Sequence, residues 1–192
     1  RRSVDRADRT KRGESGSGKT ALLQHFVRSL AHTSALVLSG RCFERESVSY
    51  KAFDSVIDEL ACYLLTQAER PIAGLPPDRL AALLHMFPVL GRVPGLAAAA
   101  TTVDGVDPVE LRRRSFEALK ALLGQIAARR PLVLCIDDIQ WSDADSGRML
   151  YALLCDDGAP PLLVIATDRD DVGHFDAASA IPELQRLASL SL

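Results

Sequence analysis

Glycines, hydroxyl groups and a lysine follow one another at fixed spacing near the start of the chain. The segment Gly13-Glu14-Ser15-Gly16-Ser17-Gly18-Lys19-Thr20 matches the pattern G-x-x-x-x-G-K-[ST] at every fixed position. Its glycines allow successive backbone N–H groups to turn towards an anion, and a helix that begins at Lys19 adds its positive end. Lys19 would supply a cation to the β- and γ-phosphates of a nucleoside triphosphate, and Thr20 a hydroxyl to Mg²⁺. The residues expected to bind the nucleotide are Gly13, Glu14, Ser15, Gly16, Ser17, Gly18, Lys19, Thr20 and Ala21.

Two adjacent acids end an apolar run further along the chain. Residues 131–136 have the composition of a strand buried on both faces, and Asp137 and Asp138 follow directly. A carboxylate at the end of such a strand is held rigidly and can bind Mg²⁺, usually through water, which is the role predicted for Asp137. Asp138 points differently and is predicted to be the general base towards the attacking water, with Lys19 as a second catalytic residue.

Helical and strand patterns alternate around these two motifs. Apolar residues recur at helical spacing in residues 19–31, 50–65 and 107–128. Short apolar runs, typical of buried strands, occupy residues 35–38, 131–136 and 161–166. This alternation predicts an α/β fold, a three-layer nucleotide-binding core with a mainly parallel sheet.

Capping residues mark several helix ends. The pattern Asp-Pro-Val-Glu at 107–110 combines an N-cap acid, a proline in the first turn and a glutamate three residues after the cap. Ser142 and Asp143 should begin a helix that runs to about residue 154. Asp78 is expected to cap a helix that ends near residue 87, and residues 91–106 to form an irregular connection.

The segment before the glycine-rich loop does not fit the rest of this pattern. A phosphate-binding loop normally follows a buried strand, whereas residues 5–12 are mostly charged and carry no strand signal. We therefore expect the first strand to be lacking, residues 1–12 to be non-native or disordered, and residues 13–192 to form a truncated nucleotide-binding core.

Composition excludes several other classes of protein. The 192 residues are 47% hydrophobic and 25% charged, which argues against wholesale disorder. The net charge of −2 and the aromatic content of 5% do not favour nucleic acid as a direct partner. No apolar run is long enough to cross a bilayer, and the first residues lack a secretory signal, so a cytoplasmic domain without membrane contact is expected.

A resemblance to a known family rests on two stretches. Residues 137–143, Asp-Asp-Ile-Gln-Trp-Ser-Asp, resemble the signature of the AAA-type ATPase domain in STAND-like signal-transduction NTPases. These domains occur in transcription regulators of the MalT type and in bacterial serine/threonine kinases with an attached ATPase module. Residues 40–53 are similar to a stretch found in the kinase-linked members. With the glycine-rich loop, the resemblance covers residues 13 to about 170.

The resemblance implies a function and further site residues. It favours ATP over GTP, and slow Mg²⁺-dependent hydrolysis as a regulatory switch that acts on attached or partner signalling modules. Nucleotide-dependent self-association is a further expectation. It places a basic sensor of the γ-phosphate at Arg169, with Thr167 as a weaker candidate. A helical lid normally follows in this family, and we expect it to be lacking here.

Other interpretations stay open at this stage. The loop could be a turn rich in glycine and serine that precedes a helix by chance, and the two acids a solvated turn. The chain could also be a catalytically weak nucleotide-binding or interaction remnant, or a P-loop kinase for a small acceptor. Residues 112–114, three arginines, could reach a neighbouring nucleotide or form a solvated helix face, and Trp141 could stack on adenine or serve in packing.

Overall fold

A four-stranded sheet lies at the centre of the molecule. The computed structural model describes residues 8–11, 18–44, 49–67, 74–97 and 102–168. Within them the strands are β1 (Asp8–Lys11), β2 (Leu36–Arg41), β3 (Leu132–Asp137) and β4 (Leu163–Thr167). All pairs are parallel and the spatial order is β1-β4-β3-β2. The prediction of an α/β fold with a mainly parallel sheet is confirmed.

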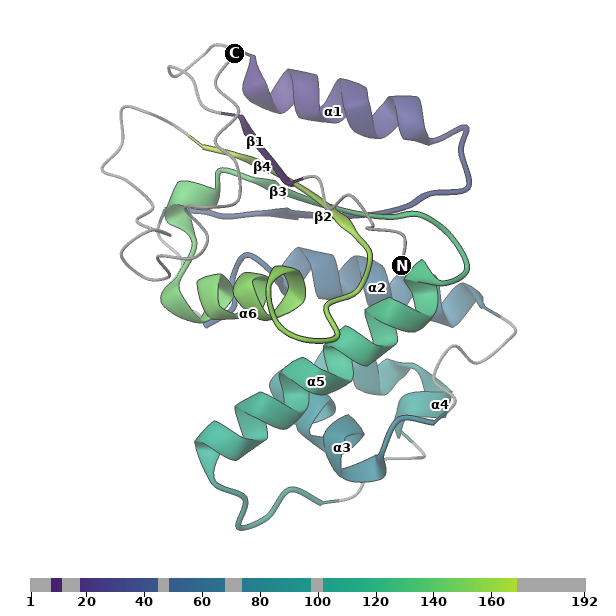
Figure 1. The fold of residues 1–192 in the computed structure, drawn as a ribbon, viewed down its shortest axis with the longest axis vertical. Coiled ribbons are helices and arrows are strands. Elements are labelled where there is room, and N and C mark those ends of the chain that lie inside the picture. Colours follow the sequence, from purple (N-terminus) through teal and green to yellow (C-terminus); the bar gives the residue numbers. More distant parts are fainter. Residues whose placement is uncertain (1–7, 12–17, 45–48, 68–73, 98–101, 169–192) are drawn as a thin grey trace.

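Helices cover both faces of the sheet (Figure 1). Helix α1 (Lys19–Leu30) lies on one face. On the other face lie α2 (Asp54–Thr66), α5 (Pro108–Ala127) and α6 (Ala144–Leu154). Beyond α5 pack α3 (Pro77–Met86), the 3-10 turn η1 (Pro88–Arg92) and the short α4 (Pro94–Ala97). A second 3-10 turn, η2 (Ile139–Trp141), joins β3 to α6.

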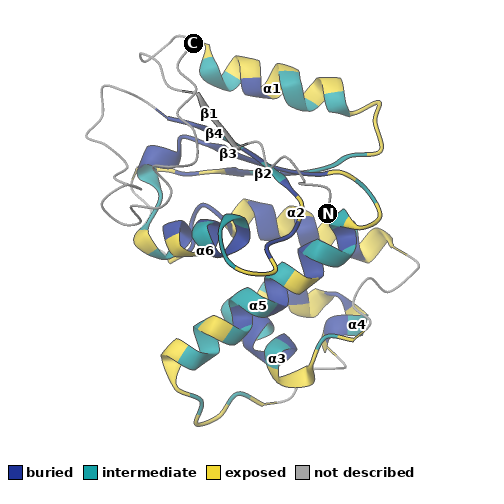
Figure 2. Ribbon diagram, viewed as in Figure 1, coloured by how far each residue is buried: buried dark blue, intermediate teal, exposed yellow. Residues whose placement is uncertain are grey.

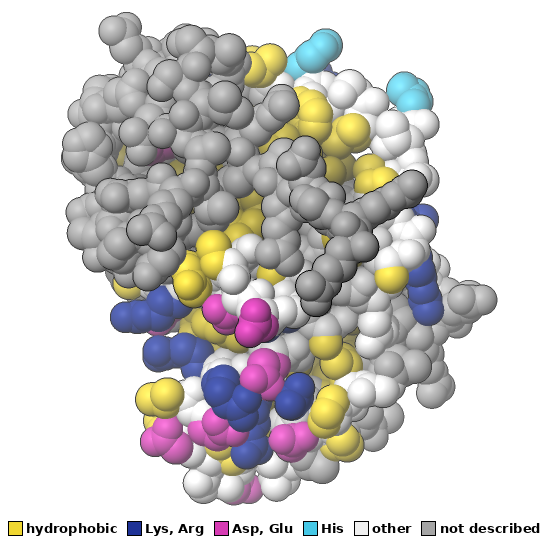
Figure 3. Space-filling model, in the orientation of Figure 1, with side chains coloured by type: hydrophobic (Ala, Val, Ile, Leu, Met, Phe, Trp, Pro, Cys, Tyr) yellow, Lys and Arg dark blue, Asp and Glu magenta, His cyan; other side chains and the backbone are white. Residues whose placement is uncertain are grey.

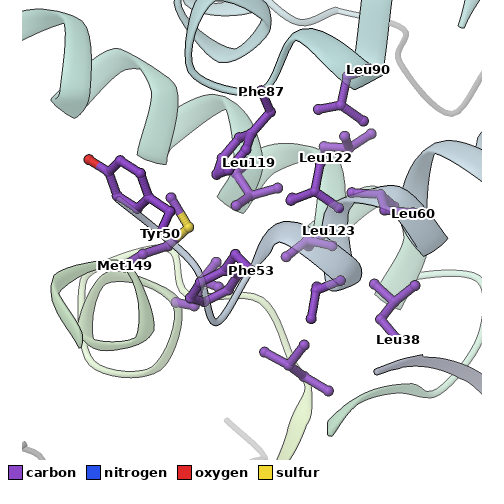
Figure 4. Packing of buried hydrophobic residues seen from close by; sticks show 14 of the residues in the cluster. Leu38, Tyr50, Phe53, Leu60, Phe87, Leu90, Leu119, Leu122, Leu123 and Met149 are labelled. Carbon is purple, nitrogen blue, oxygen red and sulfur yellow. The ribbon is translucent and has the colours of Figure 1, made fainter. Parts of the chain in front are cut away.

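Two hydrophobic clusters hold these layers together. The smaller lies under α1 and centres on Leu23, Val133 and Cys135. The larger fills the space between the sheet and the helices on its other face, where burial is nearly continuous (Figure 2). Leu119, Leu122 and other apolar residues interlock there (Figure 4). Strand β3 is buried along its whole length because it contributes to both clusters, as its apolar composition predicts.

The ends of the strands are aligned at one edge of the sheet. In the parallel register Arg41 of β2 lies opposite Asp137 of β3, and Ile136 lies opposite Ala166 of β4. The carboxyl ends of parallel strands meet at one edge, where the loops that carry function gather. Polar side chains from three strands are thus brought to one place.

The capping predictions are partly confirmed. Asp107 accepts hydrogen bonds from the backbone N–H groups of Val109 and Glu110, and Asp143 caps α6 in the same way. The prediction for Asp78 is wrong, because α3 begins at Pro77 with Pro76 as its N-cap. Proline has its φ fixed near the helical value and lacks an N–H, so it suits the first helical position.

Two further expectations need correction. Residues 8–11 form a strand, although we expected none in residues 5–12. The pairing of β1 with β4 is made by backbone groups, which every residue type supplies, and a strand paired on one side needs no continuous apolar run. Part of the connection expected to be irregular, residues 91–106, instead belongs to η1 and α4. Among the helices described, none combines the length and apolar character needed to span a bilayer.

Candidate nucleotide site

The start of α1 lies against the end of β3. Gly18 has φ 81° and ψ 16°, a left-handed conformation that glycine adopts without strain, and its carbonyl accepts the N–H of Leu22 at 2.9 Å. Lys19 and Thr20 therefore occupy the first turn of α1. The Thr20 hydroxyl donates to Asp137, with Oγ1 3.0 Å from Oδ2 and 3.2 Å from Oδ1. This contact joins the two sequence motifs across the sheet edge.

Asp137 is 6% exposed and has two hydroxyl neighbours. Besides Thr20, the hydroxyl of Thr167 at the end of β4 donates to its carboxylate. Thr167 Oγ1 also accepts the backbone N–H of Asp138 at 3.0 Å. The side chain of Thr167 thus fixes both the carboxylate of Asp137 and the backbone turn that follows it.

Asp138 has different partners from Asp137. Its backbone lies in the left-handed region, with φ 56°, which Asp tolerates better than most residues, and the residue is 5% exposed. Its carboxylate accepts from Arg41 Nη2 at 3.1 Å and from Gln140 Nε2 at 3.1 Å. Asp138 is thus held by one cationic and one neutral donor.

Arg41 is a site residue that sequence reasoning missed. It is the last residue of β2, and its guanidinium lies 3.1 Å from Asp138 Oδ2 and 3.9 Å from Asp137 Oδ2. The same group stacks on Phe43, 5.5 Å from the ring centroid. The side chain is 50% exposed, so it can reach both acids and solvent. In the sequence it follows a short apolar run and stands within residues 40–53, the stretch similar to the kinase-linked members.

A pocket of about 350 Å³ opens beside this group. Its walls come from α1, the end of β2, the start of α2 and the end of β3; the lining residues that matter most are Thr20, Gln24, Ser39, Arg41, Ser55 and Asp137. The volume falls within the range of small-molecule sites. Cys135 also lines it, and burial together with the nearby charge of Glu59 raises the pKa of its thiol to about 11. Cys135 therefore stays protonated near neutral pH.

Several predicted residues are placed elsewhere or lie outside the described part. Gly13–Ser17 and Arg169 fall outside the described residues. Lys19 is partly buried at the start of α1, and Ala21, two residues later, is exposed. Trp141 is partly buried against the larger hydrophobic cluster, which fits the packing interpretation.

The three arginines of α5 form ion pairs on the protein surface. Arg112 lies 3.9 Å from Asp145 of α6. Arg113 pairs with Glu110 and Glu117, and Arg114 with Glu110 and Asp78. Figure 3 shows basic and acidic side chains intermingled on the lower part of the visible face. This arrangement fits a solvated helix face better than a group poised over a nucleotide.

The oxygen atoms at the sheet edge suit a hard cation. Mg²⁺ is usually held by one or two carboxylates, a hydroxyl and the substrate phosphates. The Thr20 hydroxyl and the Asp137 carboxylate already lie within 3.2 Å of each other, so both can face one ion. In the described ranges no group of three or more His, Cys, Asp or Glu side chains is placed to hold a metal.

Comparisons with known proteins bear on this site. Similar solved structures include Drosophila ORC bound to DNA, 12% identical over 95% of this chain and 76% of that chain, with a TM-score of 0.47. Drosophila ORC with AT-rich DNA and Cdc6 gives 12% identity, 95% and 46% coverage and a TM-score of 0.47. Drosophila ORC with GC-rich DNA and Cdc6 is 13% identical over 91% of this chain and 44% of that chain, with a TM-score of 0.38. The chain thus spans less than half of the latter two proteins. Curated protein sequences contain no match to it.

The match to a protein family is more extensive. Residues 12–165, well over half of the chain, match the AAA ATPase domain. This range includes the whole glycine-rich loop, the acidic end of β3 and most of β4. The chain belongs to the AAA ATPase domain family, which makes it an ATPase by class.

Proposed function

We propose that this chain binds ATP with Mg²⁺ at the edge of its sheet and hydrolyses ATP slowly, as the switch of a larger bacterial signalling protein. The observation that carries the proposal is the contact between Thr20 and Asp137, 3.0 Å between Oγ1 and Oδ2. It brings the start of the phosphate-loop helix to the acidic strand end, as a triphosphate and its metal require.

The phosphates would bind at the N-terminus of α1. Its first N–H groups have no partner within the helix and carry its positive dipole end. Lys19 adds a positive charge at the same end, and the Gly13–Ser17 segment would complete the loop around the phosphates. Binding energy would thus come from backbone N–H groups and one lysine, with Ala21 contributing its N–H.

Thr20 and Asp137 would hold Mg²⁺. The ion would neutralise charge on the β- and γ-phosphate oxygens, and the protein supplies one hydroxyl and one carboxylate to fix it. Thr167 keeps the Asp137 carboxylate in one orientation through its own hydroxyl. This support holds the end of β3 in place beside the proposed metal site.

Asp138 would orient the attacking water and accept its proton. In the present arrangement one carboxylate oxygen accepts from Arg41 and the other from Gln140. The Arg41 cation makes Asp138 a weaker base, and the γ-phosphate would offer Arg41 another anion, so that its release from Asp138 would favour proton transfer. A base that is paired at rest gives slow basal hydrolysis, which suits a switch.

The γ-phosphate would be sensed at the end of β4. We propose Arg169 as its basic sensor, with Thr167 as the residue that transmits a change to both acids, since it contacts Asp137 and the N–H of Asp138. Release of phosphate would then loosen this edge of the sheet. Ordering and release of loops by a γ-phosphate is a common switching device.

The wider role follows from the sequence signature in residues 137–143. We propose that the chain is a STAND-like module, as in MalT-type regulators or kinase-linked ATPases, acting in the cytoplasm. Its partners would be ATP and the attached or partner signalling modules, with nucleotide-dependent self-association and without direct contact to nucleic acid or membrane.

Replacement of the loop lysine tests the site. Lys19→Ala should lower ATP affinity at least tenfold in a filter-binding assay, because the phosphates lose their only side-chain cation in the first turn. The matched control is Lys120→Ala, since Lys120 lies on α5 and pairs with Asp156 at 3.5 Å. Equal ATP affinity of the two variants and the unaltered chain would show that the site is misassigned.

A second candidate, a P-loop kinase for a small acceptor, is favoured by one observation. The pocket of about 350 Å³ shares Thr20 and Asp137 with the proposed metal site, so a molecule within it would face the γ-phosphate. Phosphate release should be measured with and without candidate alcohol and amine acceptors. Transfer of labelled phosphate to an acceptor would favour the kinase, and release to water alone the ATPase.

A remnant without turnover is separated by thermal melting. A chain that binds Mg-ATP should melt at a higher temperature when the nucleotide is present, because only the folded state binds it. A raised melting temperature without phosphate release would identify a nucleotide-binding remnant.

A further inference from the structure

One carboxylate outside the proposed nucleotide contacts receives an unusual number of hydrogen bonds. Asp143 Oδ1 accepts the backbone N–H groups of Asp145 and Ser146, each at 2.9 Å, and so caps α6. The same oxygen accepts the N–H of Tyr50 at 3.1 Å. Its Oδ2 accepts the N–H of Lys51 at 3.0 Å and the hydroxyl of Ser146 at 2.6 Å. A helix cap alone would need only two of these five donors.

The second segment held by Asp143 is far away in sequence. Residues Tyr50–Ala52 lie more than ninety positions earlier and lead into α2. Ala52 is joined to the same place, because its N–H donates to Ser146 Oγ at 3.2 Å. Three consecutive backbone N–H groups of this segment thus end at the start of α6.

The chemistry of this junction calls for a carboxylate. All five groups donate to Asp143, and an ionised carboxylate offers two oxygens that only accept. In either orientation an asparagine would present its NH₂ group to at least one backbone N–H: to that of Lys51, beside the Ser146 hydroxyl, or to three others. Burial raises the pKa of Asp143, but the hydrogen bonds from Ser146, Tyr50 and Lys51 together outweigh it and lower the pKa below its usual value.

The junction holds Tyr50 in a costly conformation. Tyr50 has φ 63°, a left-handed backbone that a bulky residue rarely adopts. Such strain persists where the surroundings fix it more than once, often in segments that switch. Its ring packs edge-on against Phe87, 5.8 Å between centroids, and against Phe116 at 6.0 Å. Figure 4 shows Tyr50 at the left edge of the hydrophobic cluster.

Both ends of the connection after β2 are therefore fixed to the acidic strand and its turn. At the near end, Cys42 N–H donates to the Asp137 carbonyl at 3.0 Å, next to Arg41. At the far end, Tyr50 and Lys51 are held by Asp143, which follows Asp138 by five residues. A shift of the Asp138 turn would act on Tyr50 through Asp143, and Tyr50 contacts residues at the end of α3 and within α5.

We propose that Asp143 is a positioning residue which couples the acidic turn of the nucleotide site to the Tyr50–Ala52 segment and, through the Tyr50 ring, to the helices below the sheet. The proposal rests on the proposed nucleotide site. It assigns a role to the last acid of the 137–143 signature, a role that capping of α6 alone does not account for. Asp143 is not among the residues that line the pocket beside Thr20 and Asp137.

The test compares two N-cap variants of the 192-residue chain. Asp143→Asn should lower kcat for phosphate release by about tenfold while KM for ATP changes less than about threefold, because the acids are misplaced and Lys19 is intact. Asp107→Ala removes the cap of α5, which accepts from Val109 and Glu110, and should leave both constants unchanged. Equal kcat of the two variants would overturn the proposal.

Hydrogen exchange provides a second readout that a merely structural role would not change. In the unaltered chain, Mg-ATP should slow exchange of the Tyr50 and Lys51 amides at least severalfold, and in Asp143→Asn this nucleotide-dependent difference should be lost. If Mg-ATP leaves these amides unchanged in the unaltered chain, the coupling does not exist.

Further variants keep the two proposals separate. If Asp143→Asn does not fold, Ser146→Ala removes the acceptor of Ala52 N–H and one donor to Asp143 while the Asp143 cap remains, and it should weaken the nucleotide-dependent difference in exchange. An unaltered chain that binds ATP without releasing phosphate would contradict the ATPase function. The coupling would then be decided by exchange alone, because that readout needs binding and not turnover.

Discussion

Arg41 Nη2 lies 3.1 Å from Asp138 Oδ2, so the proposed general base is paired with a cation that projects from the neighbouring strand. The pairing follows from the sheet, in which Arg41 lies in register with Asp137. The arginine side chain is half exposed, whereas the acid is buried. The half-exposed arginine is therefore the partner with more room to move, and in the proposed mechanism its position would tune the basicity of Asp138.

Removal of this cation should speed basal hydrolysis. Arg41→Ala removes the cation from Asp138 Oδ2, and phosphate release in Mg-ATP should rise about threefold to tenfold, since a hydrogen bond to a charged group is worth about 1.5–3 kcal/mol before solvent screening. Arg148→Ala is the control, because Arg148 is an exposed arginine whose ion pair is with Asp145. A rate equal to that of the unaltered chain would mean that Arg41 does not restrain the base, and a lower rate would mean that Arg41 is needed for catalysis.

The two acids should differ in what they contribute. Asp138→Asn should lower phosphate release by about a hundredfold or more, the usual contribution of a general base, with ATP binding retained. Asp137→Asn should instead raise the Mg²⁺ concentration needed for half-maximal rate, because a carboxylate ligand is lost. Titration of Mg²⁺ at saturating ATP separates the two effects. The same Mg²⁺ dependence in both variants would contradict the division of roles.

The elements of the fold were predictable where one local signal was strong. The run before Asp137 is apolar without interruption, and β3 is buried on both faces as expected. Asp107 and Asp143 each begin a helix, since an acid before a helix finds unpaired N–H groups wherever the helix lies in the fold. These signals act over a few residues and do not depend on the order of the strands.

The missed features depend on strand order and backbone pairing. Arg41 meets the acids only because β2 is placed next to β3, and periodicity along the chain does not encode which strands are neighbours. Strand β1 was not predicted because its residues lack an apolar run, and its pairing with β4 is made by backbone groups that any sequence supplies. The contacts of Asp143 with Tyr50 and Lys51 join residues more than ninety positions apart, so no local pattern in the sequence could predict them.

Gly40 lies so close to neighbouring atoms that replacing it with a larger residue should lower stability. A Cβ at this position would lie 2.6 Å from the Ala52 carbonyl oxygen and 2.9 Å from Val56 Cγ2. Gly40→Ala should therefore lower the free energy of unfolding by about 1–3 kcal/mol, the usual cost of overpacking, measured by urea denaturation. Gly124→Ala is the matched control, because a Cβ added there would meet no atom within 4 Å beyond its chain neighbours and its own helix backbone, and alanine favours the helix. If Gly40→Ala is as stable as the control, β2 and the Tyr50–Ala52 segment are not in close contact.

The contribution of Asp143 to stability should depend on pH in a defined direction. Hydrogen bonds from Ser146, Tyr50 and Lys51 lower its pKa in the folded state, despite burial, which acts in the opposite direction. A lowered pKa means that the unfolded chain binds the proton more tightly, so the stabilisation is present above the ordinary value of 3.8 and is lost as pH falls through the folded pKa.

The difference in free energy of unfolding between the unaltered chain and Asp143→Asn should therefore be constant from about pH 7 to pH 5 and shrink below about pH 4. Urea denaturation at a series of pH values measures this difference, with Asp107→Ala as the reference cap. A difference that instead grows as the solution becomes more acidic would show that the carboxylate is protonated in the folded protein and that Tyr50 and Lys51 are held by something else.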